Sequence, residues 1–138
     1  MTDNIPLHEF LELEYLGGND GSGVGEVRMP VKPNAFGFTQ NLHGGAIATL
    51  IDTVVVPAIG TAYEDPRLFS TIEMSVRYLG PVRSEDLVAE GWVTRRGRRV
   101  VFCDVEVRTA SAVKVATGSL IYIVGSAPSA DGSSTADA

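Results

Sequence analysis

The chain contains very little cysteine and fewer basic than acidic residues. Its single cysteine, Cys103, cannot form an internal disulfide, which favours a reducing compartment such as the cytoplasm. The 11 Lys and Arg residues are outnumbered by 17 Asp and Glu residues, and a net charge of −6 argues against general binding to nucleic acid. No apolar run approaches the ~18–20 residues that cross a bilayer, and the N-terminus lacks the pattern of a signal peptide. We therefore expect a cytoplasmic protein with no membrane or nucleic-acid partner.

The signatures of several other chemistries are also missing. The sequence has no cluster of metal ligands, no Gly-x-x-x-x-Gly-Lys phosphate loop and no dinucleotide fingerprint, so we expect neither metal nor cofactor. Cys103 has no histidine or aspartate partner at a local spacing, and we interpret it as a small core residue. With 44% apolar and 20% charged residues, the chain suits one globular domain, which we place at 1–124. Residues 125–138 lack large apolar side chains and are expected to form a disordered tail.

The distribution of apolar residues predicts an α+β domain. Residues 6–16 indicate a short helix or turn that runs into a strand, and a second strand begins near residue 24 and ends at Pro30. A loop over 32–42 precedes a long helix. Four strands are then expected, near 68–79, 85–95, 99–110 and 113–124. Antiparallel strands around one buried helix predict a single sheet wrapped on that helix.

Residues 45–60 carry the helical signal. Apolar residues recur there at offsets of three and four, which is the period of a helix. The three valines at 54–56 would by propensity favour a strand, but the length and period of the segment favour a helix buried on more than one side. Pro57 is expected to kink this helix or to mark where its last turns loosen.

The start of this helix holds the most informative motif, His43-Gly44-Gly45, with Asp52 a little more than two turns further on. The first N–H groups of a helix have no intrahelical partner, and the two glycines leave them open to a ligand. The helix dipole favours negative charge at the same end. An oxyanion trap and a nearby carboxylate are the minimum needed for acyl transfer. The plainer alternative is a turn followed by a solvated aspartate.

Three stretches, in the same order along the chain, resemble the hotdog-fold thioesterases, particularly the phenylacetate-pathway (PaaI-like) enzymes and thioesterase superfamily member 2. They are 42–52 with the helix motif, 70–81 with a strand, and 96–102 with a hairpin and the next strand. The similarity extends over residues 24–124. It implies a hotdog fold, an antiparallel sheet around one long central helix, with acyl-CoA as substrate. It also implies a homodimer, paired into a homotetramer as a dimer of dimers.

The resemblance implies a role for each residue of the site. Asp52 matches the catalytic carboxylate, which acts as general base or as nucleophile. Gly44 matches the residue whose backbone N–H polarises the thioester carbonyl, and His43 matches a histidine near the sulfur. Thr71 matches a residue that helps to place the water and is expected to reach the site from the neighbouring subunit. Gly45 is expected to contact the substrate.

One departure from the family's pattern concerns an asparagine. Family members commonly carry this residue six positions before the histidine, where the present chain has Gly37. The missing amide is supplied by Asn34, Gln40 or Asn41, or by no residue, and the sequence leaves these alternatives open. Asn41 is included among the expected substrate contacts.

Basic residues are concentrated in one predicted hairpin, where Arg95, Arg96, Arg98 and Arg99 make up four of the eleven Lys and Arg residues. Such a hairpin is either a solvated turn or a site for the phosphates of coenzyme A, which arginine recognises well. We expect coenzyme A contacts from Arg96, Arg98 and Arg99. Arg77, on a preceding strand, is a further candidate.

Two expectations concern side chains around the site. Regular strand alternation would place Glu73 on the same face as Thr71, and we interpret Glu73 as a solvated or supporting residue rather than the acid. An acyl pocket is expected between helix and sheet. Its candidate residues are Val55, Ile59, Leu68, Phe69 and Met74.

These observations predict an acyl-CoA thioesterase that hydrolyses the C–S bond with water. The alternative is a non-catalytic acyl-CoA binding module or sensor on the same fold. A dehydratase of this fold would use a histidine base with a differently placed acid, and the sequence shows no such pair. The chemical nature of the acyl group is not readable from the residues.

Overall fold

The computed structural model describes residues 5–17, 22–63 and 68–125. Its elements, in chain order, are α1 (Pro6–Leu11), β1 (Glu14–Gly17), β2 (Val24–Met29), a 3-10 turn (Pro33–Ala35), α2 (Gly44–Ala62), β3 (Phe69–Tyr78), β4 (Leu87–Arg96), β5 (Val100–Thr109) and β6 (Lys114–Val124). This order confirms the predicted succession of a short helix, two strands, a long helix and four strands. All but the first residue of the expected C-terminal tail lies outside the described residues.

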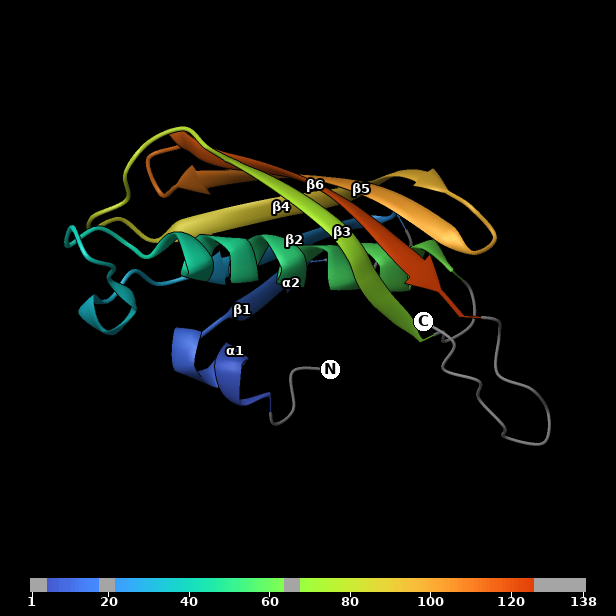
Figure 1. Ribbon diagram of the computed structural model, residues 1–138, viewed down its shortest axis with the longest axis horizontal. Coiled ribbons are helices and arrows are strands. Elements are labelled where there is room, and N and C mark those ends of the chain that lie inside the picture. Colours follow the sequence, from blue (N-terminus) through green and yellow to red (C-terminus); the bar gives the residue numbers. More distant parts are fainter. Residues whose placement is uncertain (1–4, 18–21, 64–67, 126–138) are drawn as a thin grey trace.

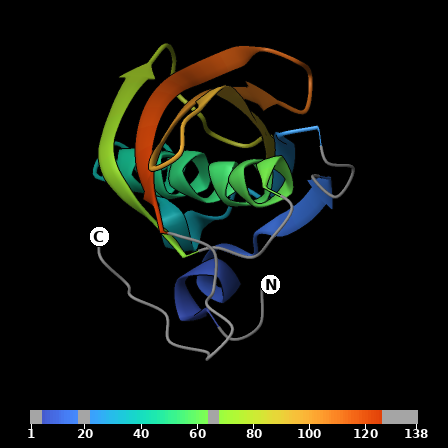
Figure 2. The same cartoon turned by 90° about the vertical axis from the view of Figure 1, so that its right-hand side faces the viewer.

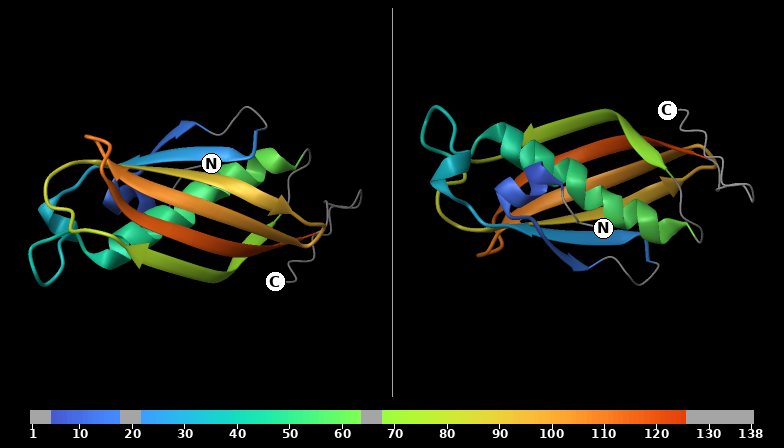
Figure 3. Two further views of the ribbon diagram at one scale, coloured as in Figure 1. Left: turned by 90° about the horizontal axis from the view of Figure 1, so that it is seen from above. Right: turned by 90° about the horizontal axis from the view of Figure 1, so that it is seen from below.

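In the described part of the chain, six strands form one curved sheet. Their spatial order is β1-β2-β4-β5-β6-β3, and every neighbouring pair is antiparallel. α2 lies in the concave face of the sheet, and α1 lies on the side of α2 that is turned away from the sheet (Figures 1 and 2). β1 and β3 are the two edge strands, and α2 crosses the sheet diagonally (Figure 3). The fold is the expected α+β arrangement of a sheet wrapped around one long helix.

Glycines in the sheet allow α2 to pack closely against it. Gly25 and Gly91 are direct partners on β2 and β4, and Gly118 on β6 lies in the same cross-strand row, beyond β5. A Cβ at Gly25 would lie 2.6 Å from the carbonyl oxygen of Val54, and one at Gly118 would lie 2.6 Å from Cγ2 of Ile51. Because atoms do not approach so closely, side chains in this row would push the helix away from the sheet.

The inner side of α2 forms the centre of the core. Its fully buried side chains are Leu50, Ile51, Val54, Val55 and Ile59. Burial against the sheet overrides the strand propensity of the valines, as predicted, and the helix continues past Pro57 to Ala62. The expectation that no apolar stretch approaches membrane-spanning length is wrong for α2, which by length and composition is apolar enough to cross a membrane. However, 56% of its 18-residue apolar window is buried inside the domain. We therefore interpret it as a core helix.

Candidate active site

His43 caps the N-terminus of α2. Its Nδ1 accepts a hydrogen bond from the Gly45 N–H at 2.8 Å, so a neutral His43 ring carries its proton on Nε2. The expectation of two open glycine amides is therefore wrong, because the histidine side chain already satisfies Gly45. The Gly44 N–H has no acceptor among the described residues. Gly44 thus offers the free donor at the positive end of the helix dipole.

Tyr78, at the end of β3, fixes the position of Gly44. Its hydroxyl donates to the Gly44 carbonyl oxygen at 2.7 Å. A Cβ at position 44 would lie 3.3 Å from the Tyr78 ring, so the glycine allows the ring to lie against the helix start. The sequence analysis missed this contact, because it joins residues that lie far apart in the chain.

Asp52 accepts two side-chain hydrogen bonds on one of its carboxylate oxygens. Oδ1 lies 2.8 Å from the Thr71 hydroxyl and 2.6 Å from the Tyr122 hydroxyl, and both hydroxyls donate to it. Oδ2 has no hydrogen-bond partner among the described residues. The carboxylate is half-buried on the flank of α2. Its geometry therefore leaves one oxygen held and the other open to a water molecule or a substrate.

The contact between Thr71 and Asp52 lies within one chain. The expectation that Thr71 reaches the Asp52 of a neighbouring subunit is therefore wrong for this structure. The reason is the sheet order, since β3 forms the edge beside β6 and passes alongside the middle of α2 (Figure 1). The hydroxyl proton of Thr71 is given to Asp52, so this hydroxyl can assist a water molecule only as an acceptor.

A β-bulge at Ile72 separates the environments of Thr71 and Glu73. Thr71 is paired with Tyr122, which is buried beneath the sheet, whereas Glu73 is paired with Ile121, the next residue of β6. Successive residues of a strand face opposite sides, so Glu73 faces away from Thr71. The expectation of a shared face is wrong because simple alternation does not include the extra residue. The interpretation of Glu73 as a residue other than the acid is consistent with its exposed position.

Tyr122 is the residue of this group that the sequence analysis did not single out. Its side chain is only 3% exposed, and its ring lies against Phe69 with the centroids 5.9 Å apart. Burial, followed by the hydrogen bond to Asp52, raises the pKa of the Tyr122 phenol, which therefore stays a protonated donor. The sequence does contain a signal that could have identified Tyr122, namely a tyrosine within an otherwise apolar strand. A tyrosine buried in such a strand needs a hydrogen-bond partner for its hydroxyl.

The arginine hairpin lies at the opposite end of α2 from Gly44. Arg96 donates to the carbonyl oxygen of Ala62 at 2.5 Å and lies over the Tyr63 ring, so it stabilises the C-terminus of the helix. A hollow of about 560 Å³ lies beside it. Its lining residues are Arg95, Gly97, Arg98, Arg99, Val100 and Phe102. Arg95, Arg98 and Arg99 form no salt bridge within the described part of the chain.

The loop before α2 uses its polar side chains internally. Asn41 donates to the Thr39 hydroxyl at 3.2 Å and accepts from Arg83 Nε at 3.1 Å. A Cβ at Gly37 would lie 3.4 Å from the His43 ring, so this glycine packs directly against the capping histidine. Within the described part of the chain, no side-chain hydrogen bond or ion pair connects Asn34, Gln40 or Asn41 with Asp52.

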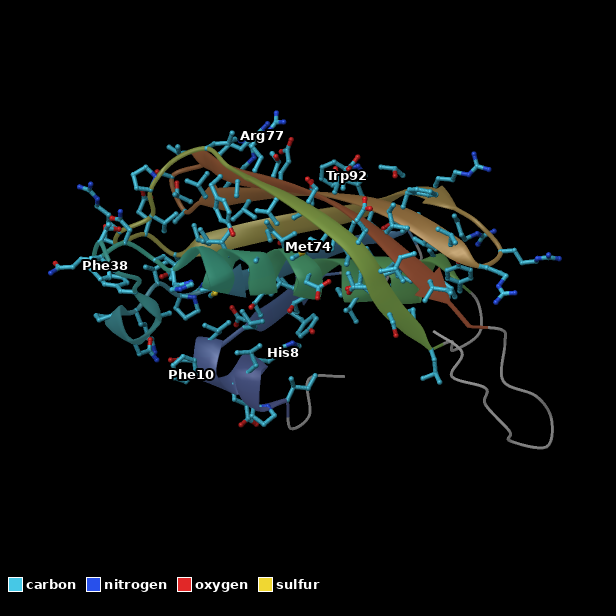
Figure 4. All side chains as sticks on the ribbon, in the orientation of Figure 1. His8, Phe10, Phe38, Met74, Arg77 and Trp92 are labelled. Atoms are coloured by element: carbon cyan, nitrogen blue, oxygen red, sulfur yellow. The ribbon has the colours of Figure 1, made fainter. Side chains whose placement is uncertain are left out.

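The remaining predicted residues lie outside the Asp52 group. Arg77 projects from β3 away from α2 (Figure 4), on the opposite side from Tyr78. Val55 and Ile59 are fully buried core residues and do not line an opening, whereas Met74 is partly exposed. Leu68 is exposed and Phe69 half-buried at the start of β3.

Cys103 is a core residue, as predicted. It is 2% exposed, and burial, followed by the charge of Asp104, raises the pKa of its thiol to about 12. A thiol with such a pKa is a poor nucleophile near neutrality. The residues that the structure describes contain no group of three or more side chains suited to hold a metal ion.

The fold and the motif at the start of α2 define a class of protein, the hotdog-fold thioesterases. The chain belongs to the thioesterase superfamily, whose family model matches residues 39–116. It is 35% identical over 111 residues to a Halobacterium salinarum protein that is provisionally named an esterase, covering 79% of this chain. It is 37% identical over 75 residues to a similarly named Caenorhabditis elegans protein, covering 54% of this chain. The chain covers 59% and 44% of the lengths of these two relatives.

A solved structure shows the same fold at low sequence identity. The PaaI protein of the Escherichia coli phenylacetic acid degradation operon matches with a TM-score of 0.80 and 20% identity. The match covers 88% of this chain and 85% of that protein. At this identity the likeness concerns the fold alone.

Proposed function

We propose that the protein is an acyl-CoA thioesterase, which converts an acyl-CoA and water into the free acid and the coenzyme A thiol. The observation that carries this proposal is the arrangement of Asp52, with Oδ1 held by two hydroxyl donors and Oδ2 open. In one route Oδ2 takes a proton from water while the water oxygen attacks the thioester carbon. In the other, Oδ2 attacks that carbon itself and water cleaves the resulting anhydride. In both routes the C–S bond breaks with its electron pair on sulfur, and the coenzyme A thiolate receives the proton given up by the water that is consumed.

Polarisation of the thioester carbonyl is assigned to the free Gly44 N–H. The backbone amide points out of the first turn of α2, and the helix dipole adds to its attraction for a developing oxyanion. The neighbouring His43 ring is fixed by its bond to Gly45, so it is suited to contact the sulfur rather than to exchange protons on Nδ1. Gly44 and Asp52 would then act on opposite sides of one carbonyl group.

One chain cannot bring these two groups together. Eight residues of helix separate Gly44 from Asp52, which corresponds to about 12 Å along the axis. A reacting carbonyl needs its oxyanion donor and its nucleophile each within about 3 Å. The proposed site therefore requires Gly44 from a second copy of the chain, placed beside Asp52 by an antiparallel approach of two α2 helices.

The surface around Asp52 supports such a homodimer. The partly exposed flank of α2 on either side of Asp52 carries only short side chains, which allow a second helix to approach. These residues are Gly45, Thr49, Val56 and Gly60. The adjacent strand β3 is a sheet edge with exposed Ile72 and Met74, which a symmetric partner would cover. A dimer of dimers, working in the reducing cytoplasm that the single buried cysteine favours, completes the proposed assembly.

The hollow beside the arginine hairpin is the proposed site for the nucleotide end of coenzyme A. Arg98 and Arg99 offer unpaired cations for its phosphates, and Phe102 and Val100 give the hollow an apolar wall. Arg96 is held at the end of α2 and is suited to shaping the hairpin. About 15 Å of helix axis separates Asp52 from Ala62, which an extended pantetheine arm can bridge.

The arginines should govern affinity rather than chemistry. We expect Arg98→Gln or Arg99→Gln to raise KM for an acyl-CoA by about 3- to 30-fold and to leave kcat near the wild-type value, because phosphate contacts do not change in the reaction. Steady-state kinetics on the acyl-CoA and on the matching acyl-pantetheine, which lacks the phosphates, will test this. Arg108→Gln, which removes an arginine paired with Glu106, is the control. An equal effect on both substrates would contradict the assignment.

The function itself is tested with a panel of short, aromatic and long acyl-CoA esters, with detection of the released thiol. Turnover of at least one ester that depends on Asp52 supports a thioesterase. Tight binding of an acyl-CoA without any thiol release would instead indicate a binding module or sensor. Neither binding nor turnover across the panel would contradict the proposal.

A further inference from the structure

We infer that Tyr122 is a positioning residue for the hydrolytic step, which holds the Asp52 carboxylate in the orientation that keeps Oδ2 open. This inference rests on the proposed function. Tyr122 does not touch the substrate in this account, because its side chain is buried beneath the sheet. It acts through Asp52, because its hydroxyl holds Oδ1 while Oδ2 is the oxygen that reacts.

The geometry of the contact supports this role. The Tyr122 hydroxyl lies 2.6 Å from Oδ1 of Asp52 and 3.0 Å from the carbonyl oxygen of the same residue. The single phenol proton favours the carboxylate, since a hydrogen bond to a charged acceptor is the stronger one. The hydroxyl therefore lies close to both the backbone carbonyl oxygen and the carboxylate of Asp52. This restricts the rotation of the carboxylate about its χ angles.

The position of Tyr122 is well fixed. It lies on β6, between β5 and the edge strand β3, and its ring packs against Phe69. Thr71 lies directly opposite it on β3 and donates to the same carboxylate oxygen. Two donors on neighbouring strands thus hold one oxygen, so rotation of the carboxylate would break both bonds at once.

A buried phenol suits this role better than a flexible side chain. Tyr122 stays protonated throughout the pH range of an assay, because its pKa is raised. Its hydroxyl therefore donates a hydrogen bond to the Asp52 carboxylate. A donor held at Oδ1 complements the negative charge of the carboxylate that both proposed routes use.

The test compares Tyr122→Phe with Tyr15→Phe, which removes a half-buried phenol on the opposite edge strand, β1. We expect Tyr122→Phe to lower kcat by about 10- to 100-fold with little change in KM, because a hydrogen bond to a charged group is lost and the ring is retained. Tyr15→Phe should change neither quantity.

A second comparison separates positioning from a general structural role. In an Asp52→Asn background, Tyr122→Phe should lower the residual rate by less than about twofold, because the two residues act in one unit. Similar losses in both backgrounds would overturn the inference while leaving the proposed function intact. If no ester is hydrolysed by the wild-type protein, the proposed function fails instead. The ¹³C chemical shift of the Asp52 carboxyl carbon, measured at neutral pH, then decides, because it reports hydrogen bonding to the carboxylate. A chemical shift that is the same in the wild-type protein and in Tyr122→Phe would overturn the inference.

Discussion

Asp52→Asn is expected to lower kcat for acyl-CoA hydrolysis by about 10²–10⁴-fold. The amide keeps the shape of the carboxylate, and its oxygen can still accept the hydrogen bonds of Thr71 and Tyr122. It cannot take a proton from water or attack a thioester. The folded domain should therefore persist while the chemical step is lost, as measured by thiol release together with the thermal unfolding curve.

The matched control is Asp104→Asn. Asp104 accepts a hydrogen bond from Ser119 and lies on β5, away from the Asp52 group, so its loss should leave turnover near the wild-type value. Retention of more than about a tenth of wild-type turnover by Asp52→Asn would show that another group supplies the base.

Replacing Gly44 with proline is expected to have an effect of similar size. Proline removes the N–H that we assign to the oxyanion, and the loss of one such donor costs about 10²–10³-fold in kcat. The helix should tolerate the change, because position 44 is the first residue of α2 and His43 has a φ of −61° and a ψ of 135°, which suit a residue before proline.

Gly44→Ala separates the loss of the N–H from crowding. Both variants add a Cβ about as close to the Tyr78 ring, 3.3 Å in the present geometry, but alanine keeps the amide proton. We expect the proline variant to be much slower than the alanine variant, as measured by kcat on the same ester. Equal rates for the two would mean that the Gly44 N–H does not bind the reacting oxygen.

The sequence predicted the fold well, because its periodic signals are strong. The offsets of three and four over 45–60 led to α2, and the apolar runs led to β3–β6 within a few residues. The bulge at Ile72 was not predictable from alternation, because it depends on how β3 is paired with β6. Its consequence was the wrong expectation for Glu73.

The site was only partly predictable. Asp52, Gly44 and Thr71 were singled out through their spacing and their resemblance to a family, and the structure brings Asp52 and Thr71 into contact. The other contacts of these residues come from distant strands. Tyr122 and Tyr78 contact the site only because β6 and β3 pass alongside α2. His43 accepts a hydrogen bond from the Gly45 N–H, which is a local helix cap. The prediction that both glycine amides are open did not include this bond.

We propose that Asp52 of one chain and Gly44 of another form one hydrolytic site, and a mixed dimer tests this most directly. Asp52→Asn chains and Gly44→Pro chains, each inactive alone, are unfolded together and refolded, and the mixed dimers are isolated by two different affinity tags. Each mixed dimer then has one site with both lesions and one with neither. We predict thiol release at about half the wild-type rate per dimer. Mixed dimers no more active than the two parents, with subunit exchange demonstrated, would contradict the account.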